Sequence, residues 1–226
     1  CRSDQELPKD EKNKIALFCS VPTDSVISMH DVDTVYSIPV LLNKQKVDKT
    51  ILEKLKIKTN NPKLNDWKRV IKAKLLPESV VNVSFVGKYT ELKDSYKSIN
   101  EALEHAGIKN KAQVNINFVE AENITSRNIR KTLKNYDAIL VPGGFGERGV
   151  EVMILACKYA RENDIPYLGI CLGMQVAIIE YARNVLKLKG ANSTEFDQDT
   201  KHPVIGLINE WSDICLLYTS DAADEP

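Results

Sequence analysis

The second half of the chain alternates between strand-like and helix-like hydrophobic patterns. Apolar residues at every second position predict strands over 81–87 and 114–118, and short apolar runs predict strands over 136–141 and 165–170. Each predicted strand is followed by a segment with another pattern before the next strand begins. Strands separated by helices pair in parallel and are covered on both faces. We therefore expect an open, mostly parallel α/β sheet with helices on both faces.

The segments between these strands show helical spacing. Apolar residues recur three or four positions apart over 96–106, 150–163 and 172–188. Thr125 or Ser126 is placed to cap another helix, one that reaches about Leu133. The last predicted helix begins almost directly after the predicted strand before it, so we expect a sharp bend between them.

The first 76 residues have a different pattern, which predicts an arm ahead of the sheet. An apolar run over 14–21, stopped by Pro22, predicts a short buried strand. Residues 31–39 predict a loop and a helix start, and 47–76 is helical but lysine-dense. Acidic residues are interspersed among the lysines, so this segment indicates a solvated linker rather than a nucleic-acid patch. A boundary is expected at 76–78.

Composition narrows the classes of function. The chain has 226 residues, with 31 Lys+Arg and 31 Asp+Glu, so no global field attracts nucleic acid or an anionic membrane. We expect small-molecule partners or copies of itself, no membrane contact and a cytoplasmic location, because neither an apolar span nor a signal peptide is evident. Five cysteines without a Cys-x-x-Cys spacing argue against disulfides and zinc. The first residue is not Met, so we expect a fragment of a longer protein.

The bend falls on Cys171, which lies between Gly169 and Gly173. A strand that turns abruptly into a helix strains the residue at the turn and leaves little room two residues away on either side. Such a bend holds the sulfur at a helix N-terminus, where amide groups favour its negative, nucleophilic form. A buried inert cysteine is the more common reading of an isolated Gly-x-Cys-x-Gly.

A second loop is expected beside the bend. Pro-Gly-Gly-Phe-Gly at 142–146 follows a predicted strand, and open α/β sheets place their sites at the carboxyl ends of strands. Gly144 N–H and Leu172 N–H would then form an oxyanion hole next to Cys171. A phosphate-binding loop or a plain tight turn is the alternative, but neither standard nucleotide-phosphate motif is present.

Taken together, the two motifs resemble the class I glutamine amidotransferases, which release ammonia from glutamine. Further blocks resemble the CTP synthase family, in the same order and at its spacing; they lie at 14–22, 86–92, 94–98 and 191–196. The resemblance covers about 1–213. The tail 214–226 departs from the pattern and is interpreted as a non-native sequencing artefact.

This resemblance implies a cytoplasmic homotetramer that uses ATP and Mg²⁺ to aminate UTP to CTP, with GTP as an allosteric activator and L-glutamine as the ammonia source. It implies no prosthetic group and no metal ligand in this chain. Residues 1–76 would be the end of the amidoligase domain with the inter-domain linker, and 77–213 an incomplete amidotransferase domain. The tetramer would form through an N-terminal domain that this chain lacks.

The resemblance also implies roles for individual residues. Cys171 would be the nucleophile, and the glutamine would be held by Gly144, Leu172, Gly173, Met174, Gln175 and Glu195. The nucleotides ATP, CTP and UTP would contact Arg2, Lys14, Phe18, His30, Asp31 and Val32. The segment that responds to GTP would include Tyr89 and Lys97. His30, His105 and His202 do not match the family's catalytic histidine, so the triad His and Glu are expected outside this chain, and the chain alone is expected to be inactive.

Two other functions remain open at this stage. The alternatives are a part of an amidotransferase that feeds ammonia to another acceptor, and a scaffold that keeps the fold and has lost its triad. The complete reading frame discriminates among the three. A phosphate-binding loop with a UTP domain upstream is expected of the first and absent from most other amidotransferases, and a His-x-Glu downstream is expected of an active enzyme and not of the scaffold.

Overall fold

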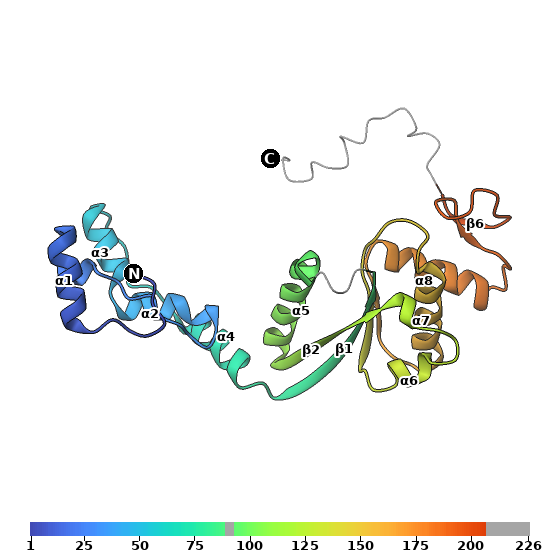
Figure 1. The fold of residues 1–226 in the computed structure, drawn as a ribbon, viewed down its shortest axis with the longest axis horizontal. Coiled ribbons are helices and arrows are strands. Elements are labelled where there is room, and N and C mark those ends of the chain that lie inside the picture. Colours follow the sequence, from blue (N-terminus) through green and yellow to red (C-terminus); the bar gives the residue numbers. More distant parts are fainter. Residues whose placement is uncertain (89–92, 207–226) are drawn as a thin grey trace, which may run out of the picture. The chain divides into compact units, whose positions relative to one another are not determined.

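The chain folds into two compact units, shown as a ribbon in Figure 1. One unit consists of Cys1–Val80 with Glu101–Gln113, and the other of Val81–Asn100 with the residues from Val114 on. The structure is a computed structural model and describes residues 1–88 and 93–206. Within those ranges, none of the helices has both the length and the apolar character that a membrane span requires.

The first unit is helical, and its start corrects the sequence prediction. The expected strand over 14–21 is wrong, because residues 14–19 belong to a helix, α1 (Lys9–Cys19). The charged residues just before the apolar run form the first turns, and Ser20 ends the helix in the left-handed conformation at φ 53°. An apolar run this short does not distinguish a strand from a helix.

Three further helices complete the start of the chain. The helix start expected near residue 38 is present, since Pro39 lies in the first turn of α2. The lysine-dense segment forms two helices rather than one, separated by ten residues, 55–64, that include Pro62. The helices are α2 (Ile38–Lys44), α3 (Val47–Lys54) and α4 (Asn65–Leu75).

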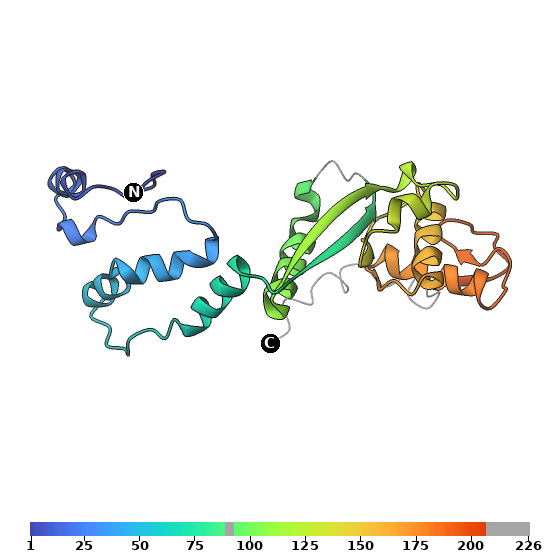
Figure 2. The same cartoon turned by 90° about the horizontal axis from the view of Figure 1, so that it is seen from below.

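The sheet that positions the site lies in the second unit. Its four strands are ordered β2-β1-β3-β4, and both β1–β3 and β3–β4 pair in parallel. The views in Figures 1 and 2 show this open sheet with its helices, which confirms the predicted fold class. The strands are β1 (Ser79–Gly87), β2 (Ala112–Glu120), β3 (Ala138–Val141) and β4 (Tyr167–Gly169).

The predicted helices are also present, with one later start. Thr125 does not begin a helix directly: its backbone N–H donates to Asn128 Oδ1 at 2.7 Å, and α6 starts one residue after Asn128. A small parallel pair, β5 (Asn192–Ser193) and β6 (Pro203–Ile205), follows the last helix. The helices are α5 (Lys97–Asn110), α6 (Ile129–Leu133), α7 (Val150–Glu162) and α8 (Leu172–Asn184).

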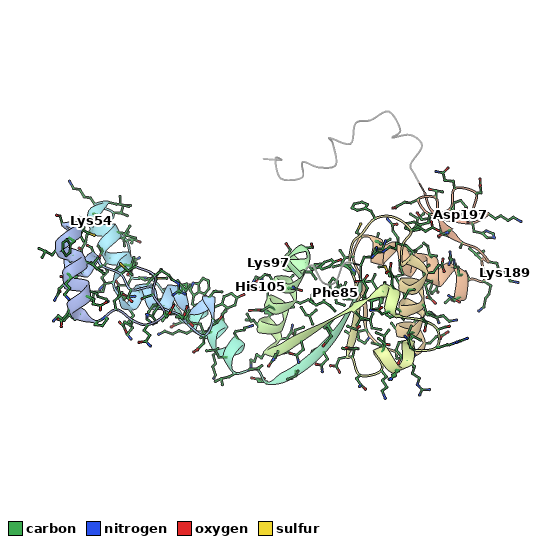
Figure 3. All side chains as sticks on the ribbon, in the orientation of Figure 1. Lys54, Phe85, Lys97, His105, Lys189 and Asp197 are labelled. Atoms are coloured by element: carbon green, nitrogen blue, oxygen red, sulfur yellow. The ribbon has the colours of Figure 1, made fainter. Side chains whose placement is uncertain are left out.

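Successive residues of β1 are buried on opposite faces of the sheet, as expected for a parallel sheet covered on both faces. Val86 belongs to the main hydrophobic core, together with residues of α6, α7 and α8. Phe85, labelled in Figure 3, packs instead against the rings of Tyr96 and Phe118, with ring centroids 4.6 and 4.8 Å away. This packing immobilises the carboxyl end of β1.

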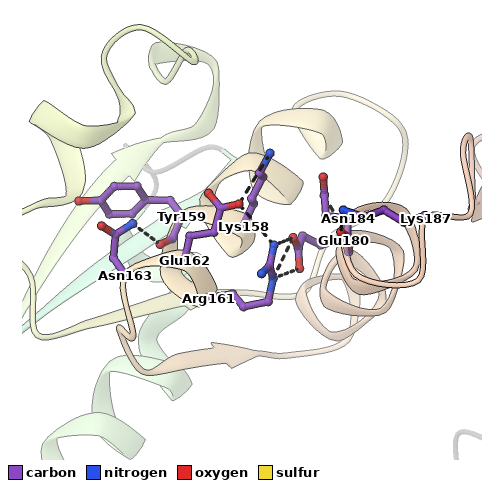
Figure 4. A network of polar contacts seen from close by, with 8 residues as sticks. All are labelled: Lys158, Tyr159, Arg161, Glu162, Asn163, Glu180, Asn184 and Lys187. Carbon is purple, nitrogen blue, oxygen red and sulfur yellow. Dashed lines mark hydrogen bonds and ion pairs between the residues drawn. The ribbon is translucent and has the colours of Figure 1, made fainter.

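An ion pair fastens α8 to α7. Glu180 is 1% exposed, and its carboxylate accepts three hydrogen bonds from the Arg161 guanidinium, the shortest at 2.8 Å (Figure 4). Bidentate pairing of this kind offsets the cost of burying a carboxylate. The pair raises the pKa of Arg161, chiefly through the hydrogen bond to Glu180. The ion pair therefore holds α8, the helix that begins at the sharp bend, at a residue in its interior.

Candidate active site

Cys171 lies at the sharp bend between β4 and α8. Its backbone has φ 52° and ψ −104°, a strained conformation for a residue with a side chain. A methyl group on Gly169 would lie 2.4 Å from the backbone of residue 173, and one on Gly173 would lie 2.1 Å from the carbonyl oxygen of Val141. The structure thus has the steric restriction that the sequence predicts on both sides of Cys171.

The bend presents the Cys171 side chain to solvent at the start of a helix. Cys171 is exposed, and its carbonyl oxygen accepts hydrogen bonds from Met174 N–H at 3.0 Å and Gln175 N–H at 3.1 Å. Only the backbone carbonyl of Cys171, and not its side chain, takes part in these hydrogen bonds of the first helical turn. The sulfur itself remains accessible to a ligand.

A hydrogen bond from β4 supports this bend. The Tyr167 hydroxyl donates to the carbonyl oxygen of Gly173 at 2.8 Å, which ties the strand to the first turn of α8. Burial, with smaller contributions from Cys157 and Glu180, raises the pKa of Tyr167. The phenol consequently stays protonated and able to donate.

The glycine-rich loop lies against the bend, as predicted from the parallel order of the strands. A methyl group on Gly143 would be 3.5 Å from Cys171 Cβ, and one on Gly144 would be 3.2 Å from Leu172 Cδ2. Among the hydrogen bonds formed within residues 1–88 and 93–206, none uses Gly144 N–H or Leu172 N–H as donor. Two backbone N–H groups of the segments that meet at Cys171 therefore donate no hydrogen bond within the described residues, as the donors of an oxyanion hole must.

Glu195 is brought to the same loop from far along the chain. It follows β5, and Gly146 N–H donates to its Oε1 at 3.2 Å. Its own backbone N–H donates to the hydroxyl of Ser193, which is 2% exposed. The carboxylate is exposed and negatively charged, so it can accept further hydrogen bonds from a cationic group of a ligand.

The remaining predicted glutamine ligands differ in what they offer. Met174 is 54% exposed on the first turn of α8, whereas Gly173 is buried against Val141. Gln175 Oε1 is buried and accepts no hydrogen bond within the described part of the chain. A buried acceptor without a partner is costly unless a ligand supplies the donor.

Lys88 belongs to the same constellation and was not among the predicted site residues. It is 7% exposed, and its ammonium donates to the carbonyl oxygens of Phe145 at 3.0 Å and Gly146 at 2.7 Å. Burial and the neighbouring Arg148 lower the pKa of Lys88, and Glu195 opposes this effect. The sequence block 86–92 contains this lysine, but a lysine directly after a strand usually indicates an exposed edge.

The predicted nucleotide-binding residues form two groups in the first unit. Arg2 pairs with Asp31, and a parallel bridge between Arg2 and Met29 sets His30 and Val32 next to this pair. His30 Nδ1 is buried and has no hydrogen-bond partner within the described residues. Lys14 and Phe18 lie one turn apart on α1; both are exposed, Phe18 by 87%.

The remaining predicted positions lie at the start of α5 or outside the described residues. Lys97 is exposed at the start of α5, the helix that also carries His105 (Figure 3). Tyr89 and the tail 214–226 lie outside the described residues. No group of three His, Cys, Asp or Glu side chains within 1–88 and 93–206 is arranged to hold a metal ion.

Comparisons with known proteins agree with this geometry. The family model "Glutamine amidotransferase class-I" matches residues 91–212, and the model "CTP synthase N-terminus" matches residues 1–57. A solved structure of the Trypanosoma brucei CTP synthase glutaminase domain with bound acivicin is 41% identical, with a TM-score of 0.54. The match covers 57% of this chain and 50% of that one, so the chain spans about half the length of this relative. The chain therefore belongs to the class I glutamine amidotransferase family, in its CTP synthase branch.

Proposed function

We propose that this chain is a part of a CTP synthase, which aminates UTP to CTP at the expense of ATP with ammonia released from L-glutamine. The chain supplies the nucleophile and most of the glutamine pocket. One observation carries this proposal above the others: an exposed thiol on a strained bend lies beside two amide N–H groups, those of Gly144 and Leu172, that donate no hydrogen bond within the described residues. An inert core cysteine has neither property.

Glutamine binding follows from the polar groups around the thiol. Glu195 accepts hydrogen bonds from the α-ammonium of the substrate in addition to the one from Gly146 N–H. Gln175 Oε1 is a further acceptor for the substrate. Met174 covers the methylene groups of the glutamine side chain. Together they place the side-chain amide of the glutamine next to Cys171.

The bond changes at Cys171 are those of acyl transfer. The sulfur attacks the side-chain amide carbon of glutamine, and the carbonyl electron pair moves to oxygen, where the two amide N–H groups stabilise it. The C–N bond then breaks, and nitrogen leaves as ammonia with the proton that the thiol gave up to a base. Water cleaves the resulting thioester, releasing glutamate and restoring the thiol. The resemblance places this base, a histidine, outside the chain.

The nucleotide half of the reaction is assigned to the first unit. We place the adenine nucleotide near the Arg2–Asp31 pair and His30, and the pyrimidine nucleotide near Lys14 and Phe18, at a contact between subunits of a cytoplasmic homotetramer. We further assign GTP responsiveness to the segment containing Tyr89 and Lys97, and a domain boundary near residue 76. Mg²⁺ would accompany ATP. The described residues offer it no carboxylate cluster.

Covalent labelling tests the nucleophile. The full-length protein is treated with acivicin, an electrophilic glutamine analogue and the compound bound in the trypanosomal relative. Intact-protein and peptide mass spectrometry should show one adduct, on Cys171, that is absent from Cys171→Ala and present in Cys157→Ala. Equal labelling of Cys171→Ala and the wild type would contradict the assignment.

A second measurement separates the ligase from other amidotransferases. CTP formation from UTP, ATP and glutamine is followed by absorbance or chromatography, with ammonium chloride replacing glutamine in a parallel reaction. Cys171→Ala should lose the glutamine-dependent reaction and keep the ammonia-dependent one. Acivicin labelling without CTP formation from either nitrogen source would indicate another acceptor, and absence of both would favour the scaffold interpretation.

A further inference from the structure

Lys88 is the one buried cation of the described site that glutamine hydrolysis, as set out above, does not use. It ends β1, directly after Gly87, and the parallel pairing of β1 with β3 brings it to the glycine-rich loop that follows β3. Its ammonium lies under that loop and donates to two consecutive carbonyl oxygens, those of Phe145 and Gly146. A buried ammonium is costly to keep unless it is paired in this way.

Two surrounding contacts hold Lys88 in position. The Tyr96 hydroxyl donates to the backbone carbonyl of Lys88, and the Tyr96 ring packs on Phe85 in the sheet. Gly149, at φ 75°, lies next to the lysine stem, since a methyl group there would be 3.9 Å from Lys88 Cε, an ordinary van der Waals distance. The cation is thus built into the fold and does not reach the loop from a mobile surface position.

The peptide group between Phe145 and Gly146 is held from both sides. In a trans peptide the carbonyl and the N–H point in opposite directions. The carbonyl of this group accepts from Lys88 at 3.0 Å, and its N–H donates to Glu195 Oε1 at 3.2 Å. A cation and a carboxylate therefore fix one peptide plane, two residues after the Gly143–Gly144 step that lies against the thiol.

We propose that Lys88 is a positioning residue for glutamine hydrolysis: by binding the carbonyls of Phe145 and Gly146, it aims Gly144 N–H at the oxyanion and directs Gly146 N–H toward Glu195. Lys88 does not touch the substrate and acts through the loop. This inference rests on the proposed function. It predicts that removing the ammonium impairs attack on a glutamine-like ligand while leaving the intrinsic accessibility of the thiol unchanged.

The test compares two alkylating agents at Cys171 in the full-length protein. The rate of reaction with acivicin depends on the assembled glutamine pocket, whereas the rate with iodoacetamide depends only on exposure of the thiol. The variants are Lys88→Met, which keeps the stem without donors, Lys88→Arg, which keeps charge and donors, and Lys189→Met as a matched control on an exposed lysine. Rates are followed by peptide mass spectrometry, with kcat and KM for glutamine-dependent ammonia release measured alongside.

We expect Lys88→Met to lower kcat and the rate of acivicin labelling by about 10- to 100-fold. The effect should be smaller than the roughly 10²- to 10³-fold loss that follows removal of an oxyanion donor, because Lys88→Met misaligns the donor and does not remove it. Its iodoacetamide rate at Cys171 should stay within about twofold of the wild type, because exposure of the thiol does not depend on loop alignment. Lys88→Arg should recover part of the loss, and Lys189→Met should match the wild type.

Two results would overturn the inference: an unchanged acivicin rate in Lys88→Met, or a parallel loss of both rates, which would make Lys88 a purely structural residue. If Lys88→Met does not fold, Lys88→Gln, which keeps an N–H donor, is judged by the same separation of the two rates. Failure of the wild type to react with acivicin at Cys171 would refute the proposed function instead. The two failures are therefore distinguishable.

Discussion

Cys157 and Cys171 have the same side chain and belong to two helices that pack against each other, one within its helix and the other at the start. The first is buried and the second is exposed. Cys157 lies within α7, is 6% exposed and belongs to the hydrophobic core. Burial raises the pKa of its thiol to about 12, with a further contribution from Glu180. Cys171 is exposed at the bend that begins α8. Reactivity is therefore decided by the backbone that carries the side chain.

This difference shows what the bend contributes. An ordinary helix interior hides its cysteine and surrounds it with apolar side chains that disfavour the thiolate. The bend at Cys171 places the sulfur outside the helix, next to amide N–H groups, at the cost of backbone strain that Gly169 and Gly173 make sterically possible. Four predictions test this contrast, beginning with the largest expected effect.

Exchange of each cysteine for alanine separates the two positions by activity. Cys171→Ala should lower glutamine-dependent ammonia release in the full-length protein by about 10⁴-fold or more, since loss of a nucleophile removes covalent catalysis. Cys157→Ala should retain a kcat within about twofold of the wild type and lose roughly 1 kcal/mol of stability, the lower end for a small core truncation. A coupled ammonia assay and urea unfolding measure these effects. Comparable activity in the two variants would contradict the contrast.

Alkylation of the native protein separates them by reactivity. At pH 8, iodoacetamide should modify Cys171 at least about 10²-fold faster than Cys157, because only an accessible thiolate reacts. Time-resolved peptide mass spectrometry identifies each site and distinguishes both from the exposed Cys1 and Cys19. In denaturant the two rates should converge. A native rate at Cys157 equal to that of Cys171 would show that the core is open.

Filling the space behind the bend should unfold the site and so remove the difference in reactivity between Cys171 and Cys157. Gly173→Ala forces a methyl group to within 2.1 Å of Val141 O, so we expect a loss of at least about 3 kcal/mol in the free energy of unfolding. Gly190→Ala is the matched control: Gly190 has φ 76° but no atom within 4 Å of the added methyl, and should lose only about 1 kcal/mol. Urea denaturation measures both, and equal losses would refute a steric cause.

The smallest effect concerns pH. The pKa of Cys157 rises from 9.0 to about 12 on folding, so the buried neutral thiol contributes stability that is complete below pH 9 and lost as the pH rises toward 12. The free energy of unfolding should fall over this range, less steeply in Cys157→Ala. Tyr167 contributes in the same direction, since its pKa is also raised by burial. Identical slopes in the variant and wild type would exclude titration of Cys157 as a cause.

Prediction from sequence succeeded where local sterics leave few alternatives. Gly169 and Gly173 around Cys171 predict the bend, because only glycine tolerates the close backbone approach observed there. The alternation of strand and helix patterns predicts the parallel sheet, and parallel strand order brings the loop at 142–146 to the bend. The run over 14–21 failed because eight residues of apolar pattern fit a helix as well as a strand.

The amino-acid sequence by itself determined the bend, the sheet and the family, since each depends on patterns of neighbouring residues. Only the tertiary structure decided which distant groups meet: Lys88 beneath the loop carbonyls, Glu195 on Gly146 N–H, and Arg161 on the buried Glu180. These contacts join residues 19 to 58 positions apart. In a sequence pattern, charged side chains are normally read as exposed. The packing of strands and helices buries a few of them, and a buried charged side chain needs a hydrogen-bonding or charged partner.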